Sequence, residues 1–220
     1  MAVKIEVWGD YALFTRPEMK VERVSYDVMT PSAARGIVEA IYWHPGLKWI
    51  IDSIQVCKPI KFTNIRRNEV KSTISARNVK RIMEENRGQL FMNTGDDIQQ
   101  RAAMLLQDVH YVICAHFEMT NKAAISDNPG KFQDIVMRRI RRGQFFHQPY
   151  FGCREFPVFF KECVSDIKCP QELSGRIDFG YMLYDMDYSD AENVKPMFFR
   201  AIMQDGILKI PELSSGEVVM

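Results

Sequence analysis

Two of the four histidines and one of the five cysteines lie within a single stretch, residues 109–119, whose sequence is VHYVICAHFEM. Alternate residues of this stretch form an apolar set, which is typical of a β-strand with one buried face. His110, Cys114 and His116 belong to the other set, so we expect their side chains to share the opposite face. A histidine gives or takes a proton near neutral pH. That face is therefore either a reaction site or simply the polar surface of a sheet.

A metal site is another interpretation of this face, and the remaining cysteines argue against it. Only Cys163 and Cys169 lie close together, and their spacing lacks the CxxC pattern of zinc sites. The chain begins with a strand-like sequence rather than a signal peptide, and no stretch has the roughly 20 apolar residues that span a membrane. We expect reduced thiols, no metal, no cofactor, and a cytoplasmic protein without a membrane partner.

Positive charge is concentrated in the first part of the chain, although the net charge is only +1. Residues 1–150 carry 22 Lys and Arg against 16 Asp and Glu, whereas residues 151–220 carry 7 against 12. Repeated cations with few acids match a polyanion, and arginines interleaved with aromatics fit nucleic acid better than small acidic ligands. A solvated loop, and arginines that favour a helix dipole, are the alternatives. The candidate contacts are Lys58, Arg66, Arg67, Lys71, Arg138, Arg139, Arg141 and Arg142.

The elements that must position these residues follow from caps and periodicity. Thr30 and Pro31 are typical of a helix start, and His44-Pro45-Gly46 ends that helix, so Tyr42 falls in its last turn. The phenol could close a core helix or face a groove. A second helix is predicted from about residue 131 to 142, with Gly143 as its C-terminal cap.

The order of elements through residue 143 is strand, helix, strand, basic insertion, strand, helix. This order predicts an α+β fold with a ferredoxin-like core, whose fourth strand must lie in or after the insertion. We expect residues 1–150 to form this domain, with the basic insertion around residues 63–100. Residues 151–220 are predicted to form a small acidic antiparallel β domain, with a hairpin turning at Asp205-Gly206.

Familiar enzyme motifs are missing from the sequence. It has no GxGxxG, P-loop, HExxH or GxSxG motif, which argues against dinucleotide enzymes, P-loop NTPases, zincins and common hydrolases. Three ordered blocks, WGDYALFTRPEMKVERVSYDVMTPSAARGIVEAIYWHP, DVHYVICAHF and RRIRRGQFFHQPYFGCREF, resemble the Cas-five family of CRISPR-associated proteins, of the type I-C (Dvulg, or d-type) kind. That family belongs to the RAMP superfamily.

The resemblance implies a ferredoxin-like (RNA-recognition-like) domain followed by a small C-terminal β domain. It implies a hydrolase of CRISPR antiviral defence, a metal-independent endoribonuclease that cuts CRISPR repeat transcripts to guide RNA with 2′,3′-cyclic phosphate and 5′-hydroxyl ends. The protein would keep the 5′ handle of the guide RNA in a Cascade complex, with a Cas-seven backbone and a Cas-eight large subunit as partners. The alternative is a non-catalytic subunit that binds the handle, and binding or cutting of DNA stays open.

The resemblance also implies catalytic residues. The family's proposed group is a tyrosine at the end of the first helix, with a lysine and a histidine on the later strand. Tyr42 matches the tyrosine and His116 the histidine, but Cys114 stands where the lysine is expected. A thiol cannot supply a positive charge. Lys58, an arginine of the 138–142 cluster or His110 could replace it, and the sequence does not choose among them.

Overall fold

The long strand β5 (Ile98–Met119) is the centre of the fold in this computed structural model, which describes residues 2–19, 21–190 and 192–220. It pairs with four other strands, β1, β2, β3 and β4. The sheet runs in the order β10-β8-β9-β3-β5-β1-β6, with β2 and β4 also on β5 and β7 on β8. Its other strands are β1 (Ala2–Ala12), β2 (Arg23–Val24), β3 (Leu47–Val56), β4 (Phe62–Val70), β6 (Phe159–Glu162), β7 (Arg176–Asp187), β8 (Lys195–Gln204), β9 (Ile207–Lys209) and β10 (Val218–Val219).

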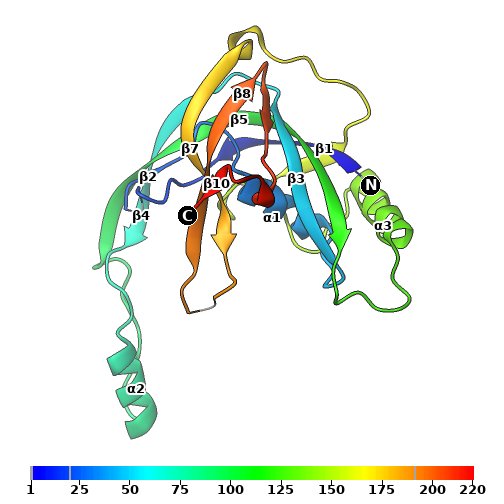
Figure 1. Cartoon of the computed structure of the whole chain (residues 1–220). Coiled ribbons are helices and arrows are strands. Elements are labelled where there is room, and N and C mark those ends of the chain that lie inside the picture. Colours follow the sequence, from blue (N-terminus) through cyan, green and yellow to red (C-terminus); the bar gives the residue numbers. More distant parts are fainter. Residues whose placement is uncertain (1, 20, 191) are drawn as a thin grey trace.

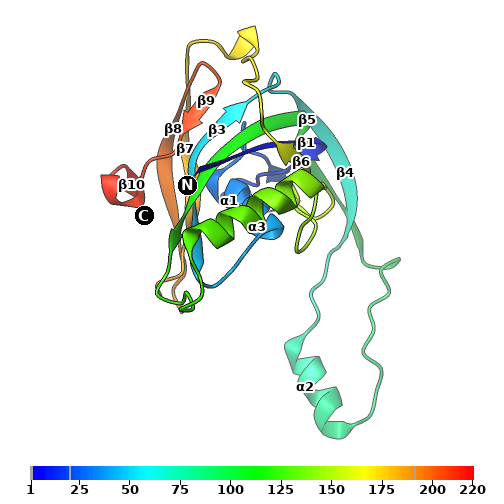
Figure 2. The same cartoon turned by 90° about the vertical axis from the view of Figure 1, so that its right-hand side faces the viewer.

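Helices α1 (Pro31–Ile41) and α3 (Pro129–Arg142) lie together against one face of the sheet (Figures 1 and 2). Their caps explain where they begin and end. The Thr30 side chain accepts a hydrogen bond from the Ala33 amide, and Pro31 occupies the first turn, where a missing N–H is harmless. Gly143 ends α3 in the left-handed conformation, with φ of 62°. The predicted caps of both helices are confirmed.

The apolar core lies between these helices and the sheet. Trp49 of β3 and Phe117 of β5 are cross-strand neighbours on this face, with ring centroids 5.4 Å apart. Phe132 of α3 packs on Phe117 at 6.2 Å and is only 1% exposed. Such buried aromatic contacts fix α3, and with it the arginines on its outer side, to the sheet.

The basic insertion forms an arm that projects from the body of the protein, with α2 (Ala76–Glu85) at its far end (Figures 1 and 2). Strand β4 pairs with the first half of β5, from Phe62 opposite Leu106 to Val70 opposite Ile98. The expected strand at 109–119 is therefore 11 residues longer at its start. The continuous apolar run AAMLL masks the alternation there, and pairing with β4, and over a few residues with β2 and β1, makes the stretch a strand.

The C-terminal strands continue the same sheet. Strand β9 pairs with both β8 and β3, so hydrogen bonds cross from the C-terminal part to the N-terminal part of the chain. Two short 3-10 helices, Gln171–Leu173 and Leu213–Ser215, lie in the connections. The hairpin at Asp205-Gly206 is confirmed, with β8 and β9 on either side. The division into domains at residue 150 stays a prediction.

The α+β class is confirmed, with a sheet that is antiparallel except for the short pair of β2 and β5. Within the sheet, β1, α1, β3, β5, α3 and β6 follow each other in the chain, and their strands lie in the order β3-β5-β1-β6. This is the element order that the ferredoxin-like interpretation requires, with β6 as the fourth strand after the insertion. The ferredoxin-like assignment remains a prediction that this order supports. Among the described residues, no helix is long and apolar enough to cross a membrane.

Candidate functional site

The two faces of β5 differ as the alternation predicts. Tyr111, Ile113 and Ala115 point into the core and are at most 2% exposed. His110, Cys114 and His116 lie on the opposite, outer face and are each partly exposed. The predicted division of this strand into a core face and an outer face that carries both histidines and Cys114 is confirmed.

His116 is held by a carboxylate from the neighbouring strand. Its Nδ1 lies 2.7 Å from Oδ1 of Asp52, and both side chains are partly exposed, at 34% and 40%. A carboxylate can only accept a hydrogen bond, so Nδ1 carries the proton in this pair. Nε2 makes no hydrogen bond to any residue that the structure describes. The ring can therefore use Nε2 to give or take a proton.

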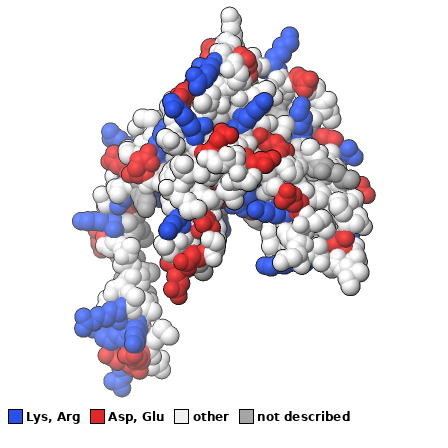
Figure 3. Space-filling view, in the orientation of Figure 1, with Lys and Arg blue, Asp and Glu red and all other residues white. Residues whose placement is uncertain are grey.

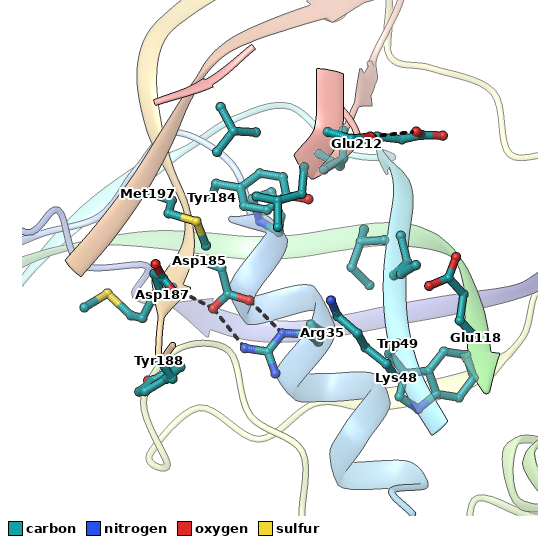
Figure 4. Close-up of a pocket in the computed structure, with 18 of the residues that line it drawn as sticks. Arg35, Lys48, Trp49, Glu118, Tyr184, Asp185, Asp187, Tyr188, Met197 and Glu212 are labelled. Atoms are coloured by element: carbon teal, nitrogen blue, oxygen red, sulfur yellow. Dashed lines mark hydrogen bonds and ion pairs between the residues drawn. The ribbon is translucent and has the colours of Figure 1, made fainter. Parts of the chain in front are cut away.

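An open cavity of about 930 Å³ lies beside His116, between α1, β3 and β7 (Figure 4). Figure 4 shows Arg35 of α1 bound to Asp185 of β7, with the Lys48 side chain extending from β3 toward this pair. Arg35 donates two hydrogen bonds of 2.9 Å to Asp185 and also binds Glu39. Burial alone would lower the pKa of Arg35, but these two carboxylates more than offset it and raise the pKa. The network fixes the first helix to the C-terminal strands.

Two lysines flank the outer face near His116, and sequence reasoning did not single them out. Lys4 of β1 lies directly opposite Cys114, and Lys48 of β3 lies opposite Glu118. Lys4 donates a 3.1 Å hydrogen bond to Asp166, which raises the pKa of its ammonium. Directly opposite residues share a face of the sheet, so both cations belong to the face that carries His116. Only the register between the strands shows that these two lysines lie near His116, and the sequence alone does not give it.

His110, the other histidine of this face, is engaged in the sheet. Its Nε2 lies 2.9 Å from Oε1 of Glu6, its ring stands edge-on to Trp8 at 6.3 Å, and its side chain is only 18% exposed. Lys161 also binds Glu6. His110 is therefore part of a packed cross-strand cluster, and it serves as a natural comparison for His116.

Tyr42 lies on the other side of the sheet. It caps the C-terminal end of α1, is 7% exposed, and its carbonyl accepts a 2.9 Å hydrogen bond from Trp49 Nε1. The guanidinium of Arg139 stacks 5.1 Å from its ring centroid. Burial raises the pKa of the phenol, although the charge of Arg139 opposes this. The structure does not bring Tyr42 and His116 together, because the sheet lies between them.

The variant Tyr42→Phe tests whether Tyr42 contributes by the packing of its ring or by the chemistry of its hydroxyl. The ring contacts with Arg139 and α3 survive in Tyr42→Phe, and only the buried hydroxyl is lost. We expect the thermal midpoint to stay within about 2 °C and any rate of RNA cleavage to stay within about threefold of wild type. A melting curve and a single-turnover cleavage assay check this. A 100-fold loss of cleavage with an unchanged thermal midpoint would move the reaction centre to the α1–α3 side.

The four candidate arginines of α3 divide into two pairs. Arg139 donates a 2.6 Å hydrogen bond to the Ile41 carbonyl, and Arg141 binds Glu162 of β6 at 2.6 and 3.1 Å. Arg138 and Arg142 are exposed and form no ion pair with any residue that the structure describes. The first pair therefore anchors α3, and the second pair is available to bind an anion.

The candidate cations in the insertion and just before it are also unequal. Lys58 binds Asp108 at 2.5 Å, and Arg67 binds Glu155. Arg66 and Lys71 are exposed. Figure 3 shows Lys and Arg side chains gathered on the far end of the arm, next to acidic ones, while both signs mix over the body. Among the described residues, no group of three or more His, Cys, Asp or Glu is placed to hold a metal ion.

Comparison with known proteins identifies the family. Residues 2–211 match a family model described as "CRISPR-associated protein (Cas_Cas5)". A protein of Mannheimia succiniciproducens named "CRISPR pre-crRNA endoribonuclease Cas5d" is 46% identical, over 98% of this chain and 97% of the relative. A protein of Thermus thermophilus with the same name is 33% identical, over 95% and 91%.

Solved structures show the same fold. The crystal structure of a CRISPR-associated protein superimposes with a TM-score of 0.69 at 24% identity, covering 100% of this chain and 97% of the other. A chain of a CRISPR RNA-guided surveillance complex superimposes with a TM-score of 0.50 at 10% identity, covering 92% and 88%. Together with the family model and the two relatives, these matches show that the chain belongs to the Cas5 family of CRISPR-associated proteins, in its type I-C branch, Cas5d.

Proposed function

We propose that this protein is a metal-independent endoribonuclease that cuts CRISPR repeat transcripts and retains the 5′ handle of the guide RNA. The carrying observation is the 46% identity, over nearly the full length of both chains, to a protein named a pre-crRNA endoribonuclease. The site adds a histidine on the outer face of the sheet, which lines an open cavity and whose Nδ1 is held by a carboxylate. Such a group suits general acid–base chemistry at neutral pH.

In the proposed reaction the ribose 2′-hydroxyl next to the scissile phosphate is the nucleophile. His116 takes its proton, the 2′ oxygen bonds to phosphorus, and the bond to the 5′ oxygen breaks. The products are a 2′,3′-cyclic phosphate and a 5′-hydroxyl. A cation is needed for the charge that develops on the phosphate oxygens. Lys4 and Lys48 are two cations that share the outer face with His116 and lie on its neighbouring strands.

RNA contacts are proposed for the cations predicted from the sequence. Arg138, Arg142, Arg66 and Lys71 are exposed and suited to phosphate contacts. Lys58, Arg67, Arg139 and Arg141 would have to exchange an internal partner for RNA. We further propose assembly in Cascade, with a Cas-seven backbone and a Cas-eight large subunit, and a cytoplasmic location. The likeness to a chain of a surveillance complex supports the assembly.

A non-catalytic subunit that binds the guide-RNA handle is the second candidate. Two observations favour it. Cys114 cannot supply the charge of a lysine, and Tyr42 lies across the sheet from His116. RNA binding would be retained in this case, because it depends on the exposed cations rather than on His116.

Cleavage in the presence of a chelator tests the proposal. We expect purified protein to cut the repeat RNA at a rate that changes less than about twofold when EDTA is added, since proton transfer needs no metal. A repeat RNA with a single 2′-deoxy substitution at the cut position should bind equally and remain intact. Denaturing gels and filter binding measure the two quantities. Tight binding without product over hours would leave the non-catalytic role.

A further inference from the structure

A β-bulge in strand β3 places the carboxylate that holds His116. The pairing of β3 with β5 shifts between Ile51 and Ser53, so that Asp52 is the extra residue. A bulge turns the side chain of its extra residue away from the position that regular alternation would give. The Asp52 backbone is also fixed, because its carbonyl accepts a 3.0 Å hydrogen bond from the Ile210 amide. The carboxylate therefore stands on rigid backbone 2.7 Å from the imidazole.

We propose that Asp52 is a positioning residue that holds the His116 imidazole in the orientation and tautomer needed for cleavage. The inference rests on the proposed function. Asp52 accepts the Nδ1 hydrogen, so the neutral ring presents the lone pair of Nε2. His116 lines the cavity, whereas Asp52 does not. Asp52 contacts His116 and not the cavity, so we expect it to act on the substrate through the ring.

His116, held by Asp52, can both take and return the one proton that the reaction moves. Nε2 takes the proton of the 2′-hydroxyl while the bond from the 2′ oxygen to phosphorus forms. The imidazolium is then stabilised by the Asp52 carboxylate, which stays ionised. When the bond from phosphorus to the 5′ oxygen breaks, the same proton passes from Nε2 to that oxygen. No metal, oxidant or further co-reactant is required.

Other charged groups lie near His116, and none has its geometry. Lys48 and Glu118 lie opposite each other on β3 and β5. They form the next pair on the same face after Ile50 and His116. Lys4 is engaged by Asp166. Among the described residues, Asp52 is the carboxylate within hydrogen-bond distance of the His116 ring. A change at Asp52 should therefore act on His116 specifically.

Substitutions of Asp52 in the full-length protein test the inference. Asn is nearly isosteric, but its amide can donate to Nδ1 and so leave the hydrogen on Nε2, where no lone pair remains for the substrate. The equivalent change in a serine-protease triad costs about 10⁴ in kcat for this reason. For the more exposed Asp52, we expect Asp52→Asn to lower the single-turnover rate about 100-fold, with the Kd for repeat RNA within twofold of wild type.

Two further measurements exclude a merely structural role. Formate added to Asp52→Ala should restore part of the rate, because the side chain is partly exposed and leaves room for a small carboxylate. Nitrogen-15 NMR of labelled histidines should show Nδ1 protonated in neutral His116 of the wild-type protein, and a shift toward protonated Nε2 in Asp52→Asn. The melting curve of each variant controls for folding.

The outcomes separate this inference from the proposed function. If His116→Ala abolishes cleavage while Asp52→Asn cuts within twofold of wild type, the positioning role is wrong and the nuclease proposal stands. If Asp52→Asn is slow but the His116 tautomer is the same as in wild type, the role is also wrong. If the wild-type protein does not cut the repeat, both proposals fall. If it cuts as well without His116, the roles of His116 and Asp52 are wrong, and the nuclease activity belongs to another group of the protein.

Discussion

His116→Ala is expected to lower the single-turnover rate of repeat-RNA cleavage by about 10²–10⁴-fold, the range that general acid–base catalysis contributes. His116 lines the open cavity of about 930 Å³, and its Nε2 makes no hydrogen bond to any residue that the structure describes. The side chain carries little of the fold, because it lies on the outer face and is one-third exposed. The Kd for RNA should stay within about twofold, since phosphate contacts dominate affinity.

The other histidine of the same strand provides the matched control. His110 has the same residue type on the same face of β5, but its Nε2 binds Glu6 and its ring packs on Trp8. His110→Ala should therefore keep the cleavage rate within about threefold and lower the thermal midpoint by a few degrees, as expected for the loss of a packed cross-strand partner. Equal loss of cleavage in both variants would show that the outer face, rather than His116, was disturbed.

The sequence could predict the face of His116 but not its partner. Alternation along residues 109–119 is a local pattern, and one buried face is enough to fix it. Asp52 lies 64 residues earlier in the chain and reaches His116 because of a bulge. The apolar and polar pattern of residues 47–56 does not predict this bulge. Register and bulges depend on how strands pair, so a carboxylate–histidine contact of this kind needs the structure.

For the helix that carries Tyr42, the sequence predicts the boundaries but not the position in the fold. Helix caps are local signals, and the structure confirms Thr30 at the start of α1 and Gly143 at the end of α3. The side of the sheet on which a helix packs is a tertiary property. Because α1 and α3 both cover the inner face, Tyr42 meets Arg139 and Phe132 rather than His116. Two residues that a resemblance joins are thus separated by the sheet in this fold.

The arginines of α3 are expected to differ in how much each contributes to RNA affinity, although all carry the same charge. Arg138 and Arg142 are exposed, without an ion pair among the described residues. In the double variant Arg138→Ala with Arg142→Ala, two phosphate contacts are lost. The slope of log K against log salt should fall in magnitude by about 1.4, at roughly 0.7 per phosphate for a single strand. The affinity near 0.15 M salt should fall roughly tenfold.

Arg141→Ala is the control for this prediction, because it removes one arginine from the same end of the helix, against two in the double variant. Arg141 already binds Glu162, so its loss releases a carboxylate and removes no contact that RNA could use without exchange. We expect its salt slope to change by less than half that of the double variant, when both are measured by fluorescence anisotropy over a salt series. If Arg141→Ala weakens binding as much as the double variant, the ion pair with Glu162 opens when RNA binds. An unchanged slope in the double variant would instead mean that RNA follows another surface, for which the exposed Arg66 and Lys71 at the arm are the next candidates.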